Sequence, residues 1–294
     1  MRLTPLGKFL LFLIGLGLIL TALHRFVPPE QQFWRGWIAG LGSPAPPTPP
    51  PVPPPVGPPG ENRPGALANQ PLAAESWVTV PAGTLLAGEE GTPTEVATFR
   101  LHRHEVTNGE YATYLAECPV GAPCGPRELP SYWDDAGYVA SRRDFPVVFV
   151  SSEDAAAFCR HAGGRLPTTV EWERAARGND ARLFPWGDSL EATFANILGP
   201  DHSAKNSAPK QIPTWSVSDA RLRRDQSPFG VLGLAGNVSE WTASRSADEP
   251  DLVLVAGGSW DSWELADARV THRVPKLPTD RSSSVGFRCA AVGR

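Results

Sequence analysis

Clusters of basic residues are missing from the body of this 294-residue chain. It has 27 lysines and arginines against 31 aspartates and glutamates, which gives a formal net charge of −4. Binding to nucleic acid requires lysine and arginine gathered on one surface, where they neutralise phosphates. The sequence therefore predicts no nucleic-acid partner. Lysine is also much less frequent than arginine, a bias typical of a GC-rich bacterial genome.

Long hydrophobic runs are scarce, and the one that stands out lies near the start of the chain. Residues 9–23 carry no charge and follow a positively charged opening segment. With its apolar flank the stretch reaches about 18 residues, near the lower limit for crossing a bilayer. A cleaved signal peptide would begin in the same way, but residues 20–25 offer a poor small-residue cleavage site. We therefore expect a transmembrane anchor over residues 9–26.

The charge pattern around this anchor predicts its orientation. Positive charge on residues 1–8 places this short segment in the cytoplasm. The rest of the chain then lies outside the bacterial inner (cytoplasmic) membrane, in the periplasm or beyond the cell.

Proline is the residue in excess, with 32 in the chain, most of them in the stretch that follows the anchor. Such a stretch cannot donate a ladder of hydrogen bonds and stays extended as polyproline II. We expect a proline-rich linker over residues 27–75, and its densest part spans roughly 60 Å at about 3.1 Å per residue. One globular domain, residues 76–294, follows.

The first half of that domain predicts alternating strands and helices. A strand begins near Trp77, and a second strand ends at Val106. Thr107 or Asn108 is suited to cap the helix that comes next. The apolar run 146–150 predicts a short buried strand.

Two further helices have clear start signals. Ser151 and Ser152 precede acidic residues that suit the positive end of a helix. Thr168 and Glu171 have the spacing of a capping box, and Gly178 ends that helix. Beyond it, glycine, proline and tryptophan predict little regular structure.

Seven segments together resemble the formylglycine-generating enzyme (sulfatase-modifying factor) family. They occur in the family's order and include RLPT-x-x-EWE, GN-x-x-EW, GGSW and GFR; their bounds are 105–115, 145–178, 184–188, 195–197, 229–242, 256–260 and 285–290. The resemblance implies an α+β domain of irregular, C-type-lectin-like fold with little regular secondary structure. It also implies a disulfide between Cys159 and Cys289.

The other two cysteines, Cys118 and Cys124, are separated by a turn-forming stretch and suggest a local disulfide in an oxidising compartment. The alternative is a metal pair, but no neighbouring His or Cys completes a tetrahedral site.

The family's chemistry uses two cysteine thiolates that bind Cu(I) and activate oxygen. Carried over from the GGS motif, whose serine is Ser259, those positions fall on Ser262 and Asp267. Soft thiolates are the ligands that Cu(I) prefers, and neither residue supplies one. We therefore expect no copper and no catalytic residue at this centre. A Ser/His/Asp triad drawn from the same segment, with His272, is less expected than a polar loop.

The resemblance further implies structural calcium. Its ligands would be the carbonyls of Gly233, Gly236 and Val238 and the carboxylate of Glu240, a set of oxygen donors that suits a hard cation. The alternative is that Glu240 only accepts hydrogen bonds in a tight turn. A second calcium site would begin at Asn196 and Ile197, although its later ligands have no counterpart in this chain.

A few other residues qualify as candidates for binding. His102 and His104 lie two apart on a strand-like stretch, so both point to one face, but no third metal ligand is visible in the sequence. We therefore expect partly exposed strand residues at these positions in preference to a metal site. Trp260, Asp261 and Trp263 follow the GGS motif and are candidate anchors for a partner, with core packing as the alternative for the tryptophans.

These observations predict a function without oxidase activity. We expect an extracytoplasmic binding or accessory module, held on a stiff stalk, that recognises a protein or peptide partner. The alternative is a sulfatase-modifying oxidase that converts a substrate cysteine to formylglycine with unusual ligands or with a catalytic partner.

Overall fold

Short strands and capped helices alternate along the part of the chain that can be described. The computed structural model describes residues 76–118, 129–134, 136–197 and 212–293. All of them belong to one unit, Gly65–Arg294. The predicted anchor 9–26 and linker 27–75 lie outside the described residues, so neither prediction is tested. No helix among the described residues is both long and apolar enough to cross a membrane.

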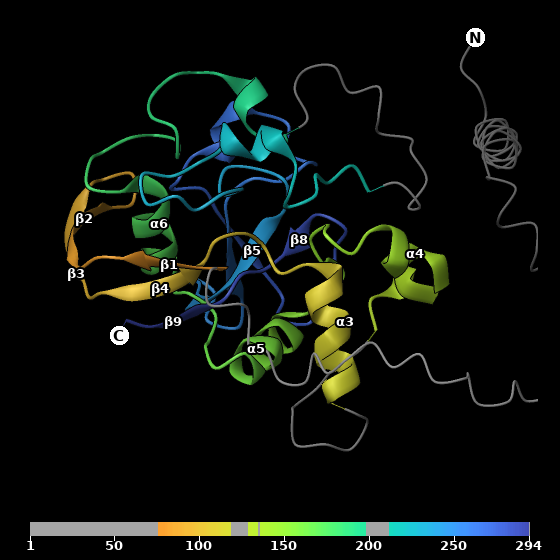
Figure 1. Cartoon of the computed structure of the whole chain (residues 1–294). Helices are drawn as coiled ribbons and strands as arrows, with labels where there is room; N and C mark the ends of the chain where they lie inside the picture. The colour runs from red at the N-terminus through yellow and green to blue at the C-terminus, as the bar shows by residue number, and fades with distance from the viewer. Residues whose placement is uncertain (1–75, 119–128, 135, 198–211, 294) are drawn as a thin grey trace, which may run out of the picture. The chain divides into compact units, whose positions relative to one another are not determined.

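The domain combines strands with helices, as an α+β fold requires (Figure 1). The strands are β1 (Trp77–Val80), β2 (Gly83–Ala87), β3 (Thr92–Val96), β4 (Phe99–His102), β5 (Ser239–Arg245), β6 (Val253–Ala256), β7 (Arg273–Lys276), β8 (Val285–Gly286) and β9 (Ala290–Val292). The α-helices are α3 (Asn108–Glu117), α4 (Ala136–Ser141), α5 (Ser152–His161) and α6 (Thr169–Arg177). Short 3-10 helices are η3 (Ser131–Asp134), η4 (Ala192–Phe194), η6 (Ala220–Arg223) and η7 (Leu265–Ala268).

Three small sheets organise these strands. The first has the order β1-β4-β9, so the last strand of the described chain pairs with the early β4. The hairpin β2–β3 forms the second sheet, and the third has the order β7-β6-β5-β8, in which β5 and β8 run parallel. Helix α6 packs between the hairpin and the β5–β6 strands, and α5 contacts both α3 and β5. Because β1 and β9 both pair with β4, the two ends of the domain lie in one sheet.

Helices α3, α5 and α6 all begin with a capping box. Thr107 caps α3, Ser151 caps α5, and Thr168 caps α6, and in each case an acidic side chain three residues later bonds back to the cap. The box predicted at Thr168 is confirmed, as is the end of α6 at Gly178, whose φ is +79°. Left-handed backbone of this kind favours glycine.

The strand predicted over residues 146–150 is wrong, although its burial is right. Val147, Val148 and Val150 are buried, but Phe149 has a φ of +56°, which interrupts an extended conformation. The backbone groups of this segment bond to scattered partners instead of to one ladder: Val147 N–H donates to Val106 O, and Phe149 N–H donates to Ser282 O. An apolar run predicts burial but not the direction of its hydrogen bonds.

Two large apolar clusters form the core. One gathers around Tyr111, Trp241 and Phe287, between α3, α5 and β5. The other gathers around Trp172 and Leu101, between α6, the hairpin and β4. The predicted Cys159–Cys289 disulfide is present in the first cluster and links α5 to the segment just before β9. Cys118 is also disulfide-bonded, and Cys124, the partner predicted for it, lies outside the described residues.

Candidate functional site

The two positions that hold thiols in the family lie in a loop between β6 and β7. The Oγ of Ser262 accepts a hydrogen bond from Ser259 N–H at 2.9 Å. The carboxylate of Asp267 accepts from the N–H groups of Trp263 and Glu264, at 3.1 and 3.3 Å, and so caps η7. Both side chains therefore act as acceptors for the backbone of their own loop. Neither is a soft ligand for Cu(I).

The Ser/His/Asp arrangement considered for the same loop is not assembled. His272 Nδ1 lies 3.9 Å from Asp267 Oδ1. The hydroxyl of Ser259 instead accepts from Asp261 N–H, and the hydroxyl of Ser262 is used as described above. Among the described residues, no serine of this loop hydrogen-bonds to the imidazole of His272, so no nucleophile is activated.

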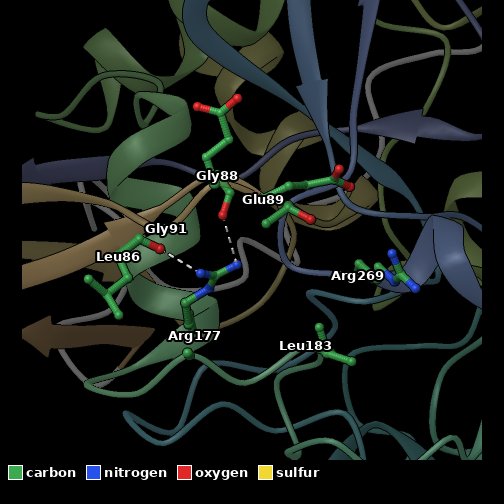
Figure 2. A pocket seen from close by; sticks show the side chains of 10 residues that line it. Leu86, Gly88, Glu89, Gly91, Arg177, Leu183 and Arg269 are labelled. Carbon is green, nitrogen blue, oxygen red and sulfur yellow. Dashed lines mark hydrogen bonds between the residues drawn. The ribbon is translucent and has the colours of Figure 1, made fainter.

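A pocket of about 290 Å³ lies next to this loop (Figure 2). The tip of the β2–β3 hairpin forms one wall, residues 181–183 form another, and Arg269 with Thr271 completes it. Arg269 follows Asp267 by two residues in the sequence, so the loop that carries the family's catalytic positions also contributes to the pocket. Leu86 and Leu183, 40% and 38% exposed, provide its apolar surface.

The two arginines of the pocket have different roles. Arg177 is buried and donates to the carbonyls of Leu86 and Gly88, which fixes the hairpin tip (Figure 2). Arg269 is exposed, and its guanidinium has no hydrogen-bond or ion-pair partner among the described residues. The pocket thus offers apolar contact beside an unpaired positive charge, and Glu89 and Glu90 add negative charge to its rim.

A buried arginine organises the GN-x-x-EW segment. Arg288 bonds to both carboxylate oxygens of Glu240, each at 2.7 Å. Trp172 Nε1 donates to the same carboxylate at 2.8 Å. The guanidinium also donates to four backbone carbonyls, those of residues 102, 103, 232 and 233. Arg288 therefore joins β4, β5 and the segment that precedes β9.

Two further carboxyl groups share this buried environment. Burial raises the pKa of Glu105 to about 8, although Arg288 opposes the shift. Burial likewise raises the pKa of Asp225 to about 7, against the hydrogen bond from Ala235 N–H. One guanidinium does not offset the burial of these carboxylates, so the protonated form of Glu105 is favoured at neutral pH, while Asp225 titrates near neutral pH.

This arrangement does not fit a calcium ion bound through Glu240. Both oxygens of that carboxylate accept from Arg288 or Trp172, and the carbonyl of Gly233 accepts from Arg288 as well. A second cation beside the guanidinium would be repelled. Gly236 and Val238 supply at most the remaining carbonyl ligands.

At the second predicted calcium position, Asn196 O accepts from Asn237 N–H, and its side-chain amide donates to Pro213 O and Asn237 Oδ1. Ile197 is half-buried against a small apolar cluster. Calcium at Asn196 and Ile197 stays a prediction.

The aromatic candidates separate by burial. Trp260 packs against Val148, Ile212 and Val238, and its Nε1 donates to Ser283 O, so core packing explains it. Trp263 is 49% exposed, and Asp261 is exposed beside it. Only Trp263 retains the exposed surface that an anchor residue needs.

His102 is fully buried at the end of β4, so the expectation of a partly exposed strand residue is wrong for it. His104, two residues later, lies against it. Their ring centroids are 4.5 Å apart. Burial, then the neighbouring charges of His104 and Arg288, hold the pKa of His102 well below its usual range. The structure brings Glu110 of α3 to this pair, a neighbour that sequence reasoning missed.

Comparisons with known proteins agree with the motifs. A protein of Bos taurus named Inactive C-alpha-formylglycine-generating enzyme 2 is 36% identical over 159 residues, which cover 52% of this chain and 52% of that protein. The Formylglycine-generating enzyme of Mycobacterium tuberculosis is 28% identical over 297 residues, covering 73% of this chain and 97% of that protein. The structure of PvdO from Pseudomonas aeruginosa has a TM-score of 0.52 at 22% identity, and covers 76% of this chain and 100% of that one.

These likenesses differ in what they establish. The chain spans about half the length of the inactive mammalian relatives it matches. The structural likeness shows the fold alone. The family description "Sulfatase-modifying factor enzyme 1-like domain" matches residues 64–292, which is more than half of the chain. The chain therefore belongs to the sulfatase-modifying factor, or formylglycine-generating enzyme, family.

Proposed function

We propose that this chain is a non-catalytic member of the formylglycine-generating enzyme family that binds an extracytoplasmic protein or peptide. One observation carries the proposal: Ser262 and Asp267, at the family's thiol positions, serve as hydrogen-bond acceptors within their own loop. A relative that bears the word "inactive" in its name supports the same conclusion. In this proposal the chain is anchored by residues 9–26 in the bacterial inner membrane, and the proline-rich linker holds the domain away from it.

The pocket beside that loop is the binding surface that we propose. Leu86 and Leu183 suit an apolar side chain, and the guanidinium of Arg269, which no described residue pairs with, suits a carboxylate on the same partner. Trp263, exposed in the adjoining loop, extends the surface. An extended peptide with an apolar residue next to an acidic one matches this combination.

The absence of oxidase activity is tested by Cu(I) titration and by assay of a peptide that contains the CxPxR sequence. The purified chain should bind no stoichiometric Cu(I) and form no formylglycine. The Mycobacterium tuberculosis relative provides the positive control under the same conditions. Stoichiometric copper, or formylglycine made by the isolated chain, would favour the alternative of an oxidase with unusual ligands. Activity that appears only after a second protein is added would favour an accessory role in catalysis.

The binding surface is tested by placing a photo-crosslinkable residue at Leu183 in the membrane-bound chain. Leu277 is the matched control, since it is 53% exposed and does not line the pocket. Crosslinks specific to position 183, lost with Arg269→Glu, are expected. Equal crosslinking at both positions would contradict the pocket as the binding surface.

A further inference from the structure

A cluster of three potential metal ligands lies where β4 leads into α3. His102 ends β4, His104 follows two residues later, and Glu110 stands in the first turn of α3. One ligand atom from each side chain lies within 4.8 Å of the other two. None of these three residues lines the pocket or belongs to the loop between β6 and β7 that contains Ser262 and Asp267.

The hydrogen bonds of both imidazoles fix which nitrogen faces the cluster. Nδ1 of His102 lies 2.8 Å from the carbonyl oxygen of His104, and Nδ1 of His104 lies 2.9 Å from that of Glu105. A carbonyl oxygen only accepts, so each Nδ1 carries the hydrogen and donates it. In the neutral ring, Nε2 then presents a lone pair. Histidines that bind metal ions are oriented in the same way, by donation from the other ring nitrogen to a carbonyl or carboxylate.

The lone pair on Nε2 of His102 accepts no hydrogen bond from the described residues. This nitrogen is buried, has no hydrogen-bond partner within the described part of the chain, and lies 3.6 Å from Oε1 of Glu110, too far for a hydrogen bond. In the neutral ring these two atoms are both acceptors that face each other, an unfavourable arrangement that a cation between them relieves. The other carboxylate oxygen of Glu110 accepts from the N–H and hydroxyl of Thr107, which leaves Oε1 available.

The spacing also suits a metal ion. Zinc binds imidazole nitrogen and carboxylate oxygen at about 2.0–2.2 Å, so two ligands of a tetrahedral site stand about 3.4 Å apart. The 3.6 Å between Nε2 of His102 and Oε1 of Glu110 is close to that value. The half-exposed His104 and Glu110 leave water access to a fourth position.

We propose that His102, His104 and Glu110 bind one divalent transition-metal ion, zinc being the best match, with a water molecule as the fourth ligand. A site with two imidazoles, one carboxylate and an open position binds transition-metal ions of this kind in preference to calcium or magnesium, which favour oxygen ligands. The ion would fasten the end of β4 to the start of α3.

The test uses the full chain, purified in detergent without an oligohistidine tag and stripped of metal. Zn²⁺ is titrated against a competing chromophoric chelator, and zinc content is measured by mass spectrometry. One zinc per chain with submicromolar affinity is expected, together with a rise in melting temperature on zinc addition. Co²⁺ should give the intense visible absorption of a four-coordinate site. A chain that binds no zinc tighter than the micromolar range would overturn the proposal.

Three variants locate the site. His104→Ala removes a half-exposed ligand, and Glu110→Gln removes the charge while glutamine still serves in a capping box. Loss of an outer partner typically weakens metal binding about 10–100-fold, so each of these should weaken it by at least that factor. His161→Ala is the matched control, a histidine paired with Glu117 elsewhere, and should bind zinc like the parent chain. Unchanged affinity in the first two variants, with melting curves that show them folded, would contradict the site, as would equal loss in His161→Ala.

Discussion

At the scale of single residues, the most unusual feature is a charged centre inside the core. Arg288 is fully buried and is held by Glu240 and by backbone carbonyls, with Glu105 and Asp225 nearby. A buried ion pair of this kind contributes little net stability but is costly to break, because the partner left behind is unpaired. The GN-x-x-EW and GFR motifs, far apart in the sequence, meet in this one contact.

The protonation of Glu105 makes stability depend on pH. Its pKa is raised from 4.5 to about 8 in the folded chain, so between these values the native state holds a proton that the unfolded state releases. Stability then falls as pH rises through this window, by at most about 1.4 kcal/mol per pH unit for one group. Glu105→Gln cannot ionise and still accepts from Asn237, so its stability should decline less steeply between pH 5 and 8. Chemical denaturation at a series of pH values measures this slope.

Asp225 adds a slope of the same sign that ends near pH 7 instead of near pH 8, so some pH dependence should survive in Glu105→Gln. Glu153→Gln, which alters an exposed carboxylate at the start of α5, serves as the control and should keep the parent slope. If Glu105→Gln and Glu153→Gln both follow the parent profile, the buried carboxyl is ionised throughout and the assignment is wrong.

At the scale of elements, the sequence revealed helix starts better than strands. Caps are local, so Thr168 with Glu171 and Ser151 could be recognised from spacing alone. The segment 146–150 could not be predicted as a buried loop, because the partners of its backbone, such as Val106 and Ser282, come from distant parts of the chain. For the same reason the sequence showed His102 and His104 but not Glu110, whose place near them depends on how α3 leaves β4.

The cap of α6 should contribute measurably to stability, since a helix of nine residues is too short to be stable alone. Thr168→Ala removes the side chain that accepts from Glu171 N–H and should lower the free energy of unfolding by about 1 kcal/mol. Thr168→Ser restores the acceptor and should recover most of the loss. Thr279→Ala, at an exposed position outside the helices, should change stability little. Denaturant titrations compare the four chains, and a neutral Thr168→Ala would show that tertiary contacts alone hold α6.

At the scale of the whole molecule, the resemblance to the family indicated the class of fold, but neither the motifs nor the local patterns predicted which strands pair. The pairing of β9 with β4 and the contact of Arg288 with Glu240 join residues more than a hundred and about fifty positions apart, and no periodicity indicates either. The pocket was likewise beyond prediction, since its walls come from the hairpin, residues 181–183 and residues 269–271. What the sequence did show is the loss of both thiols, and the proposed function rests on that.

The Cys159–Cys289 disulfide closes a loop with a sequence separation of 130 and should be the strongest single constraint on the unfolded chain. Chain-entropy estimates give about 5 kcal/mol for a loop of this length and about 2 kcal/mol for the six-residue separation of the predicted Cys118–Cys124 bridge. The double variant Cys159→Ala/Cys289→Ala should therefore lose more stability than Cys118→Ala/Cys124→Ala, as measured by denaturant unfolding without reductant. Both sulfur atoms of the long-range bridge are buried, so part of its loss is packing. Equal losses in the two variants would mean that loop length does not decide the contribution of a disulfide in this chain.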